Sequence, residues 1–173
     1  MKSSKFLFLD RDGIINSRPP EHNYVKSVSD LILNYPLFEV LARLHRAGIK
    51  FAVVSNQRGI KLGSIRFIEL LKINDKIYKE AHKYDFEFEG IAYCTHLMEE
   101  KCFCRKPSPG LIQDFLLNLN LSVESCFLLG DEKTDAQAGR KAGINTIHYG
   151  CLDHECVCDF KLYDFKQLEA LLK

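Results

Sequence analysis

Two aspartates, Asp10 and Asp12, follow an apolar segment near the start of the chain and are separated by one residue. Alternate side chains of an extended segment point to the same side, so we expect the two carboxylates to converge where the segment ends. Converging carboxylates attract a cation, and Mg²⁺ prefers oxygen ligands of this kind. Bound Mg²⁺ would let a carboxylate attack an anionic phosphate, because the metal neutralises part of the phosphate charge. For this motif alone, the alternative is a strand followed by an acidic turn.

The chemistry that suits this pair is phosphate-ester hydrolysis in two steps. We assign Asp10 as the nucleophile, because an aspartyl-phosphate intermediate divides one difficult hydrolysis into two easier reactions. Asp12 is the candidate general acid for the leaving oxygen, and then the base that activates water.

Two further segments carry groups that bind phosphate. Ser55, Asn56 and Gln57 follow a second apolar segment, where a hydroxyl and backbone N–H groups can hold phosphate oxygens. A helix cap or a buried turn hydroxyl is the alternative for Ser55. Arg105 and Lys106 are adjacent cations, and we assign Lys106 to the transferred phosphate and the nucleophile and Arg105 to the substrate. Surface cation pairs are common, so this pair alone indicates little.

A third apolar segment ends at Asp131, which we predict to be a further carboxylate ligand of Mg²⁺. Asp135 follows at a predicted helix start. We expect it to cap that helix or to orient Lys106 rather than to bind the metal, since carboxylates are favoured at helix N-termini.

Cysteine and histidine form two clusters. Cys94, His96, Cys102 and Cys104 supply four ligands around one short loop, which predicts a structural tetrahedral Zn²⁺ site that delivers Arg105 to the substrate. Scattered thiols beside an exposed histidine are the alternative.

The second cluster has less regular spacing. It contains Cys151, His154, Cys156 and Cys158. We interpret these residues as partly buried thiols, with a second metal site as the alternative, and Cys126 as a core residue.

The elements that must position these groups alternate between strands and helices. Strands are predicted at residues 5–9, 51–55, 90–94, 126–129 and 146–149. Helices are predicted around residues 37–44, ending near Gly48, and from Ser108 and Pro109 onward. This alternation predicts an α/β fold in which a parallel sheet has helices on both faces, and right-handed crossovers gather Asp10, Ser55 and Asp131 at one edge. Residues 17–33 are expected to form a loop over that edge.

Composition limits the possible partners. The chain has 173 residues, 46% of them hydrophobic, and a formal net charge of +1, which predicts a single domain spanning residues 1–173 and argues against nucleic-acid or membrane partners. The short apolar segment at the N-terminus is no signal peptide, and clustered cysteines suggest a reducing compartment. We expect a cytoplasmic monomer that acts on a small phosphorylated metabolite.

The order of the motifs DxDG, Ser-Asn, Lys and GDxxxD resembles the haloacid dehalogenase superfamily of phosphohydrolases. DRDG, SNQxGI, CxH with CxC, and CRKPxPG are similar to its branch of D,D-heptose 1,7-bisphosphate phosphatases and histidinol-phosphatases, over about residues 5–145. The resemblance implies a three-layer, Rossmann-like fold with a minimal cap and a zinc-binding loop. It implies these roles: Asp10 as nucleophile, Asp12 as acid and base with its backbone carbonyl on Mg²⁺, Asp131 as metal ligand, Ser55 and Asn56 as phosphate contacts, and Lys106 as charge partner.

The activity implied first is removal of the C7 phosphate of a heptose 1,7-bisphosphate, in the synthesis of nucleotide-activated heptose for lipopolysaccharide. Histidinol-phosphatase activity is the alternative substrate class, and a catalytically inactive, zinc-stabilised binding protein is the alternative of a different kind. Four intact motifs argue against the inactive protein.

Three positions depart from the heptose enzymes. Arg58 replaces a small residue, Leu62 replaces an arginine, and Glu132 replaces a lysine. A sugar bisphosphate needs two anion sites, so either Lys133 compensates or the distal substrate group differs.

Overall fold

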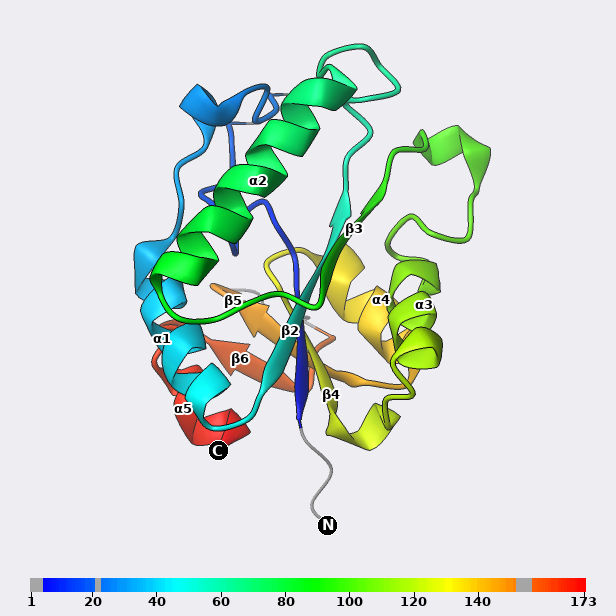
Figure 1. The fold of residues 1–173 in the computed structure, drawn as a ribbon. Helices are drawn as coiled ribbons and strands as arrows, with labels where there is room; N and C mark the ends of the chain where they lie inside the picture. The colour runs from blue at the N-terminus through cyan, green and yellow to red at the C-terminus, as the bar shows by residue number, and fades with distance from the viewer. Residues whose placement is uncertain (1–4, 21–22, 152–156) are drawn as a thin grey trace.

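The computed structural model describes residues 5–20, 23–151 and 157–173 and contains one six-stranded parallel sheet (Figure 1). The strands are β1 (Phe6–Leu9), β2 (Lys50–Asn56), β3 (Gly90–Cys94), β4 (Cys126–Gly130), β5 (Asn145–Tyr149) and β6 (Phe160–Leu162). Their order across the sheet is β3-β2-β1-β4-β5-β6, so the first strand of the chain is central.

The register of the central strands determines what meets at the carboxyl edge. Leu9, the last residue of β1, lies opposite Val53 of β2 and Leu129 of β4. The backbone N–H of Asp10 still donates to the carbonyl of Leu129, at 2.9 Å. The residues that follow these strands therefore leave the sheet side by side.

Helices cover both faces of the sheet, which makes three layers (Figure 1). One face packs against α1 (Tyr35–Arg46), α2 (Phe67–Lys83) and α5 (Gln167–Leu172), and the other against α3 (Gly110–Asn118) and α4 (Lys133–Ala142). Short 3₁₀ helices span Val28–Asp30, Met98–Glu100 and Val123–Ser125. Alternate strand residues supply the two cores: Leu7 and Leu9 point to the first face, Phe6 and Phe8 to the second.

The predicted α/β architecture and its five strands are confirmed. The glycine predicted to end the first helix, Gly48, has a φ of +87°, the left-handed conformation that glycine adopts without strain. The helix predicted to start at Ser108 and Pro109 is α3, and it begins later than predicted. Its first residue is Gly110, and Pro109 precedes it. Strand β6 and helix α5 were not predicted, because each is too short to show a clear period.

Among the described residues, no helix has the length and apolar character needed to cross a membrane. Cys126 is fully buried in β4, as predicted. In the second cysteine cluster, His154 and Cys156 lie outside the described residues, so the second-metal alternative stays untested.

Candidate active site

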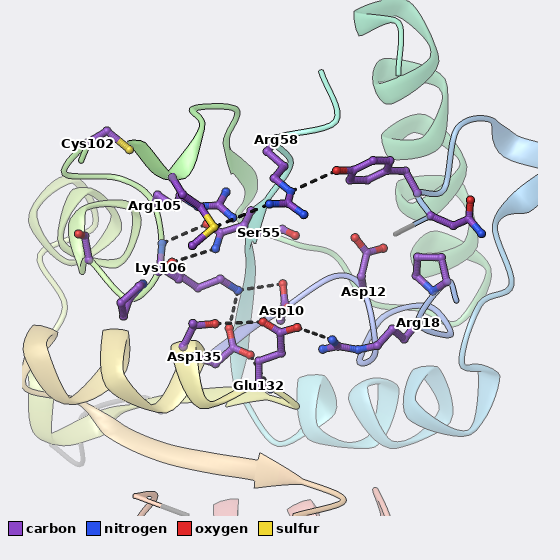
Figure 2. A pocket seen from close by; sticks show the side chains of 18 of the residues that line it. Asp10, Asp12, Arg18, Ser55, Arg58, Cys102, Arg105, Lys106, Glu132 and Asp135 are labelled. Atoms are coloured by element: carbon purple, nitrogen blue, oxygen red, sulfur yellow. Dashed lines mark hydrogen bonds and ion pairs between the residues drawn. The ribbon is translucent and has the colours of Figure 1, made fainter. Parts of the chain in front are cut away.

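A cavity of about 840 Å³ opens at the carboxyl edge of the sheet (Figure 2). Its floor carries Asp10 and Asp12 from the turn after β1, Ser55 from the end of β2, Lys106 from the loop before α3, and Asp135 from α4. Residues 18–20, 23 and 24 and the loop between β3 and α3 form its walls.

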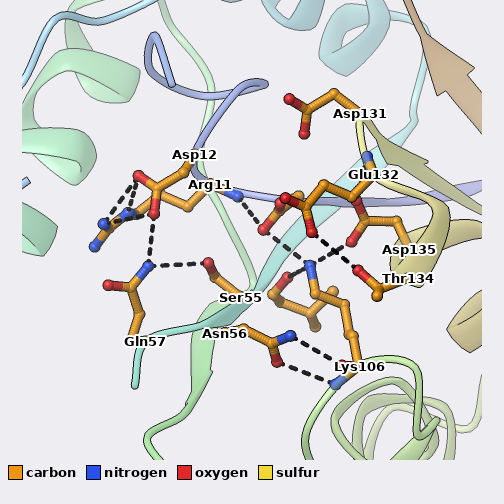
Figure 3. Close-up of polar contacts among 12 residues, drawn as sticks. Arg11, Asp12, Ser55, Asn56, Gln57, Lys106, Asp131, Glu132, Thr134 and Asp135 are labelled. Carbon is orange, nitrogen blue, oxygen red and sulfur yellow. Dashed lines mark hydrogen bonds and ion pairs between the residues drawn. The ribbon is translucent and has the colours of Figure 1, made fainter. Parts of the chain in front are cut away.

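Lys106 is buried at the centre of this floor. Its Nζ lies 2.9 Å from Asp10 Oδ1 and 2.6 Å from Asp135 Oδ1, and it donates to the carbonyl of Val54 at 2.9 Å (Figures 2 and 3). Asp135 also accepts a hydrogen bond from the backbone N–H of Glu132, and this hydrogen bond caps the N-terminus of α4. Asp135 thus both caps the helix and orients Lys106.

Burial and charge shift the titration of these groups. Burial raises the pKa of Asp10 to about 6, and the adjacent Lys106 ammonium only partly opposes this effect. Burial alone would lower the pKa of Lys106, but Asp10 and Asp135 raise it above its usual value. The lysine therefore remains a cation beside the candidate nucleophile.

Asp131 brings a third carboxylate to the same place. Single oxygens of Asp10, Asp131 and Asp135 all lie within 4.8 Å of one another. Gly13 makes room for this arrangement, because its φ is +98° and a Cβ atom there would stand 1.9 Å from Asp131 Oδ2.

The donor set at this cluster fits a hard divalent cation such as Mg²⁺. Asp131 Oδ1 is buried and has no hydrogen-bond partner among the described residues, which leaves it available as a ligand. The other oxygen, Oδ2, is paired with the Arg18 guanidinium, whose Nε lies 2.9 Å away, and Arg18 also contacts Glu132. Burial raises the pKa of Asp131, and Arg18 opposes that effect.

The carboxylate of Asp12 is turned away from this cluster (Figure 3). It accepts hydrogen bonds from Arg11, Asn16 and Gln57. Its side chain still lines the cavity, as the proposed acid–base role requires.

Ser55, Asn56 and Gln57 occupy three different environments. Ser55 lines the cavity and accepts a hydrogen bond from Gln57 Nε2 at 3.1 Å. Asn56 exchanges two hydrogen bonds of 3.0 Å with the backbone of Lys106, so its side chain holds the lysine segment. Gln57 is buried behind Ser55 and is absent from the cavity lining. Their predicted phosphate contacts remain predictions, and the geometry favours Ser55.

The cavity rim is cationic. Arg58, Arg105 and Lys101 all line it, and within the described residues none of them is paired with a carboxylate. Arg58 Nε instead donates to the hydroxyl of Tyr24, at 3.1 Å. Lys133, the residue considered as a compensating cation, is exposed and is not part of the lining.

The first cysteine cluster closes around one point. Cys94, His96, Cys102 and Cys104 offer single atoms that all lie within 4.8 Å of one another. Sγ–Sγ separations are 3.5 and 3.6 Å, and His96 Nδ1 lies 3.2 Å from Cys104 Sγ. A tetrahedral Zn²⁺ with bonds of about 2.0–2.3 Å would separate its ligands by roughly 3.5–3.8 Å, so the cluster is close to that geometry.

Sequence reasoning assigned no role to Arg11, Arg18 or Tyr24, all of which the fold brings to the site. Arg18 and Tyr24 belong to the loop expected over the sheet edge, but an irregular loop gives no signal for which residue reaches the cavity. Arg11 lies inside the DRDG motif, and its position between two aspartates was the feature of the sequence that could have indicated a role at the site.

A family model described as haloacid dehalogenase-like hydrolase matches residues 21–149. A Helicobacter pylori protein named D-glycero-beta-D-manno-heptose-1,7-bisphosphate 7-phosphatase is 35% identical over 148 residues, which cover 83% of this chain and 82% of that protein. A Vibrio cholerae protein of the same name is 36% identical, over 81% of this chain and 77% of its own length.

A bifunctional histidine biosynthesis protein HisB of Blochmanniella floridana is 31% identical over 85% of this chain, which spans 41% of that longer protein. Among solved structures, D,D-heptose 1,7-bisphosphate phosphatase from B. bronchiseptica, complexed with magnesium and phosphate, superposes with a TM-score of 0.86 at 26% identity. That match covers 97% of this chain and 98% of the other.

Proposed function

The chain belongs to the haloacid dehalogenase-like hydrolases, and on that premise we propose that it is a Mg²⁺-dependent phosphatase that removes the C7 phosphate of D-glycero-D-manno-heptose 1,7-bisphosphate. The observation that carries the proposal is the position of Asp10. Its carboxylate lies beside the Lys106 ammonium and within reach of Asp131, in a cavity whose rim carries unpaired cations.

In the first step, an oxygen of Asp10 attacks the phosphorus and the bond from phosphorus to the sugar oxygen breaks. Asp12 gives its proton to that leaving oxygen, so the sugar departs as an alcohol. Lys106 balances charge as the carboxylate becomes an acyl phosphate, while Ser55 holds a phosphate oxygen.

In the second step, Asp12 takes a proton from a water molecule, and the water oxygen attacks the phosphorus. The bond between phosphorus and Asp10 breaks, which restores both carboxyl groups and releases inorganic phosphate. The same residue thus serves once as acid and once as base.

Two metal ions belong to the proposal. Asp10, Asp131 and the backbone carbonyl of Asp12 would hold Mg²⁺, which would supply charge neutralisation of the phosphate. Cys94, His96, Cys102 and Cys104 would hold a structural Zn²⁺, which would fix the loop that carries Arg105.

The charge of the rim favours a substrate with a second anionic group. Arg58, Arg105 and Lys101 would attract the C1 phosphate of a bisphosphate, whereas they would repel the ammonium group of histidinol phosphate. Histidinol phosphate remains the second candidate, because a HisB protein is 31% identical over 85% of the chain.

The test is phosphate release from three substrates with Mg²⁺ and zinc-loaded enzyme: the heptose 1,7-bisphosphate, the heptose 7-phosphate and histidinol phosphate. We expect kcat/KM to be highest for the bisphosphate. A preference for histidinol phosphate would overturn the assigned substrate but not the chemistry. If no sugar or amino-alcohol phosphate is hydrolysed, the chain is the inactive binding protein instead.

A further inference from the structure

Arg11 is the largest fully buried side chain among the residues that the structure describes, although it stands between the two aspartates of the candidate active site. Its Nε lies 3.1 Å from Asp12 Oδ1, and its Nη2 lies 2.9 Å from each of the two Asp12 carboxylate oxygens (Figure 3). This two-pronged contact fixes the plane of the carboxylate as well as its position.

Two amide groups complete the enclosure of Asp12. Asn16 Nδ2 donates to Oδ1 at 3.0 Å, and Gln57 Nε2 donates to Oδ2 at 2.9 Å. Each carboxylate oxygen therefore has at least two donors. Since Gln57 Nε2 also donates to Ser55 Oγ, the orientation of Asp12 is tied to a hydroxyl of the residue that lines the cavity at the end of β2.

The burial of the Arg11 guanidinium costs free energy of folding, and that cost is unexplained unless the guanidinium has a function. Removing a guanidinium from water carries a penalty of several kcal/mol that one ion pair offsets only with good geometry. Here Nη1 is buried without a hydrogen-bond partner, and Asp12 is the carboxylate that pairs with Arg11 in the described structure. A hydrophobic residue would fill this space at lower cost.

Arg11 also has no direct access to the substrate. Asp12 lines the cavity, whereas Arg11 does not. The backbone N–H of Arg11 donates to Asp10 Oδ1 at 2.7 Å, and a side-chain substitution keeps that contact. The guanidinium can therefore influence the reaction through Asp12, in contrast to Arg18, Arg58 and Arg105, which face the cavity.

We propose that Arg11 is a positioning residue that aims the Asp12 carboxyl group at the leaving oxygen of the substrate. This inference rests on the proposed function, in which Asp12 protonates that oxygen while the bond to phosphorus breaks. A sugar alkoxide is a strong base and needs this proton to depart. A 4-nitrophenolate is a weak base and departs without this proton. Misorientation of the Asp12 carboxyl group should therefore slow release of the sugar more than release of 4-nitrophenolate.

The experiment compares kcat/KM of the metal-loaded enzyme for a sugar phosphate and for 4-nitrophenyl phosphate. In a two-step mechanism, kcat/KM reports only the steps up to release of the alcohol, so hydrolysis of the aspartyl phosphate does not contribute. For Arg11→Met we expect a loss of about 100-fold on the sugar phosphate, the scale of one general acid, and a much smaller loss on the aryl phosphate. Arg11→Lys keeps the charge but not the two-pronged contact. Its kcat/KM for the sugar phosphate should lie between that of the wild-type enzyme and that of Arg11→Met.

Two further variants calibrate the result. Asp12→Asn should show the same dependence on the leaving group as Arg11→Met. Arg43→Met removes an arginine that pairs with Glu169 away from the cavity, and it should leave both substrates unaffected.

An equal loss on both substrates, in Arg11→Met or in Arg11→Lys if the first variant does not fold, would overturn the inference and indicate a purely structural arginine. No loss would overturn it as well, because Asn16 and Gln57 would then suffice to hold Asp12. Wild-type enzyme that hydrolyses neither substrate would overturn the proposed function itself.

Discussion

Lys106 holds two buried carboxylates at once, and its own charge is what makes their proximity tolerable. Asp10 and Asp135 are almost inaccessible to solvent, and the lysine between them is equally buried. Without that ammonium group, two desolvated negative charges would face each other close to a third, Asp131.

The first prediction at this scale concerns stability. Lys106→Met should lower the free energy of unfolding by about 3–5 kcal/mol at neutral pH in metal-free protein, because it leaves buried carboxylates unpaired. The deficit should shrink as the pH falls, since burial holds the pKa of Asp10 above its unfolded value and protonation removes the unpaired charge. Urea denaturation at two pH values measures both effects.

Lys133→Met is the matched control, because Lys133 is exposed and lies outside the cavity. It should change stability by no more than about 0.5 kcal/mol. If the two variants are equally stable, the charge balance described for Lys106 is wrong.

The second prediction concerns Arg58, which Tyr24 holds at the rim. Arg58→Ala should raise KM for the bisphosphate about tenfold or more, the value of one charge-assisted hydrogen bond, and leave KM for the monophosphate unchanged. Steady-state kinetics with both substrates measures the ratio. Arg66→Ala, an exposed arginine paired with Glu69 outside the cavity, is the control. Equal effects on the two substrates would exclude Arg58 from the recognition of the distal group.

At the scale of elements, the loop between β3 and α3 joins the cysteine cluster to the reacting centre. Cys104 is followed directly by Arg105 and then by Lys106, so the loop sets the positions of a rim cation and of the central lysine together. The four candidate zinc ligands come from one short segment, which has too few residues to form a hydrophobic core of its own. A bound metal ion would stabilise the loop in place of such a core.

The prediction for this element is that purified protein contains one zinc ion per chain and that Cys104→Ser, which removes a ligand, loses it. The variant should show a higher KM for the bisphosphate and an unchanged far-ultraviolet circular dichroism spectrum, because the sheet does not depend on the loop. Elemental analysis and kinetics with added Mg²⁺ measure these effects. Zinc-free wild-type protein with full activity would contradict the role of the loop.

The strands of the sheet could be predicted from the sequence, whereas contacts between distant side chains could not. Strands β1, β2 and β4 each contain a continuous apolar segment, which is the pattern of a buried parallel strand, and polar residues follow that segment directly or after one glycine. The convergence of Asp10, Ser55 and Asp131 followed from topology alone. Contacts between distant side chains did not follow, because no local period encodes them: the Asn56 contact with the Lys106 backbone and the Arg18 contact with Asp131 depend on how loops pack.

At the scale of the whole molecule, the central position of β1 explains why so small a fold can assemble the site. Strand β2 on one side of β1, the turn after β4 on the other side, and helix α4 all send residues to one edge of the sheet. This edge is where open parallel sheets bind ligands in general. The loop with Arg18 and the cysteine loop then close the cavity from opposite sides, as Figure 2 shows.

In the proposed mechanism, phosphorus becomes bonded to Asp10 during turnover. The most direct measurement mixes Mg²⁺-loaded enzyme with substrate, stops the reaction with acid within milliseconds, and locates the phosphoryl group by peptide mass spectrometry. We expect a phosphorylated peptide containing Asp10 that is absent from Asp10→Asn, a variant whose turnover should fall by several orders of magnitude. A phosphoryl group on another residue, or undiminished turnover by Asp10→Asn, would contradict this mechanism.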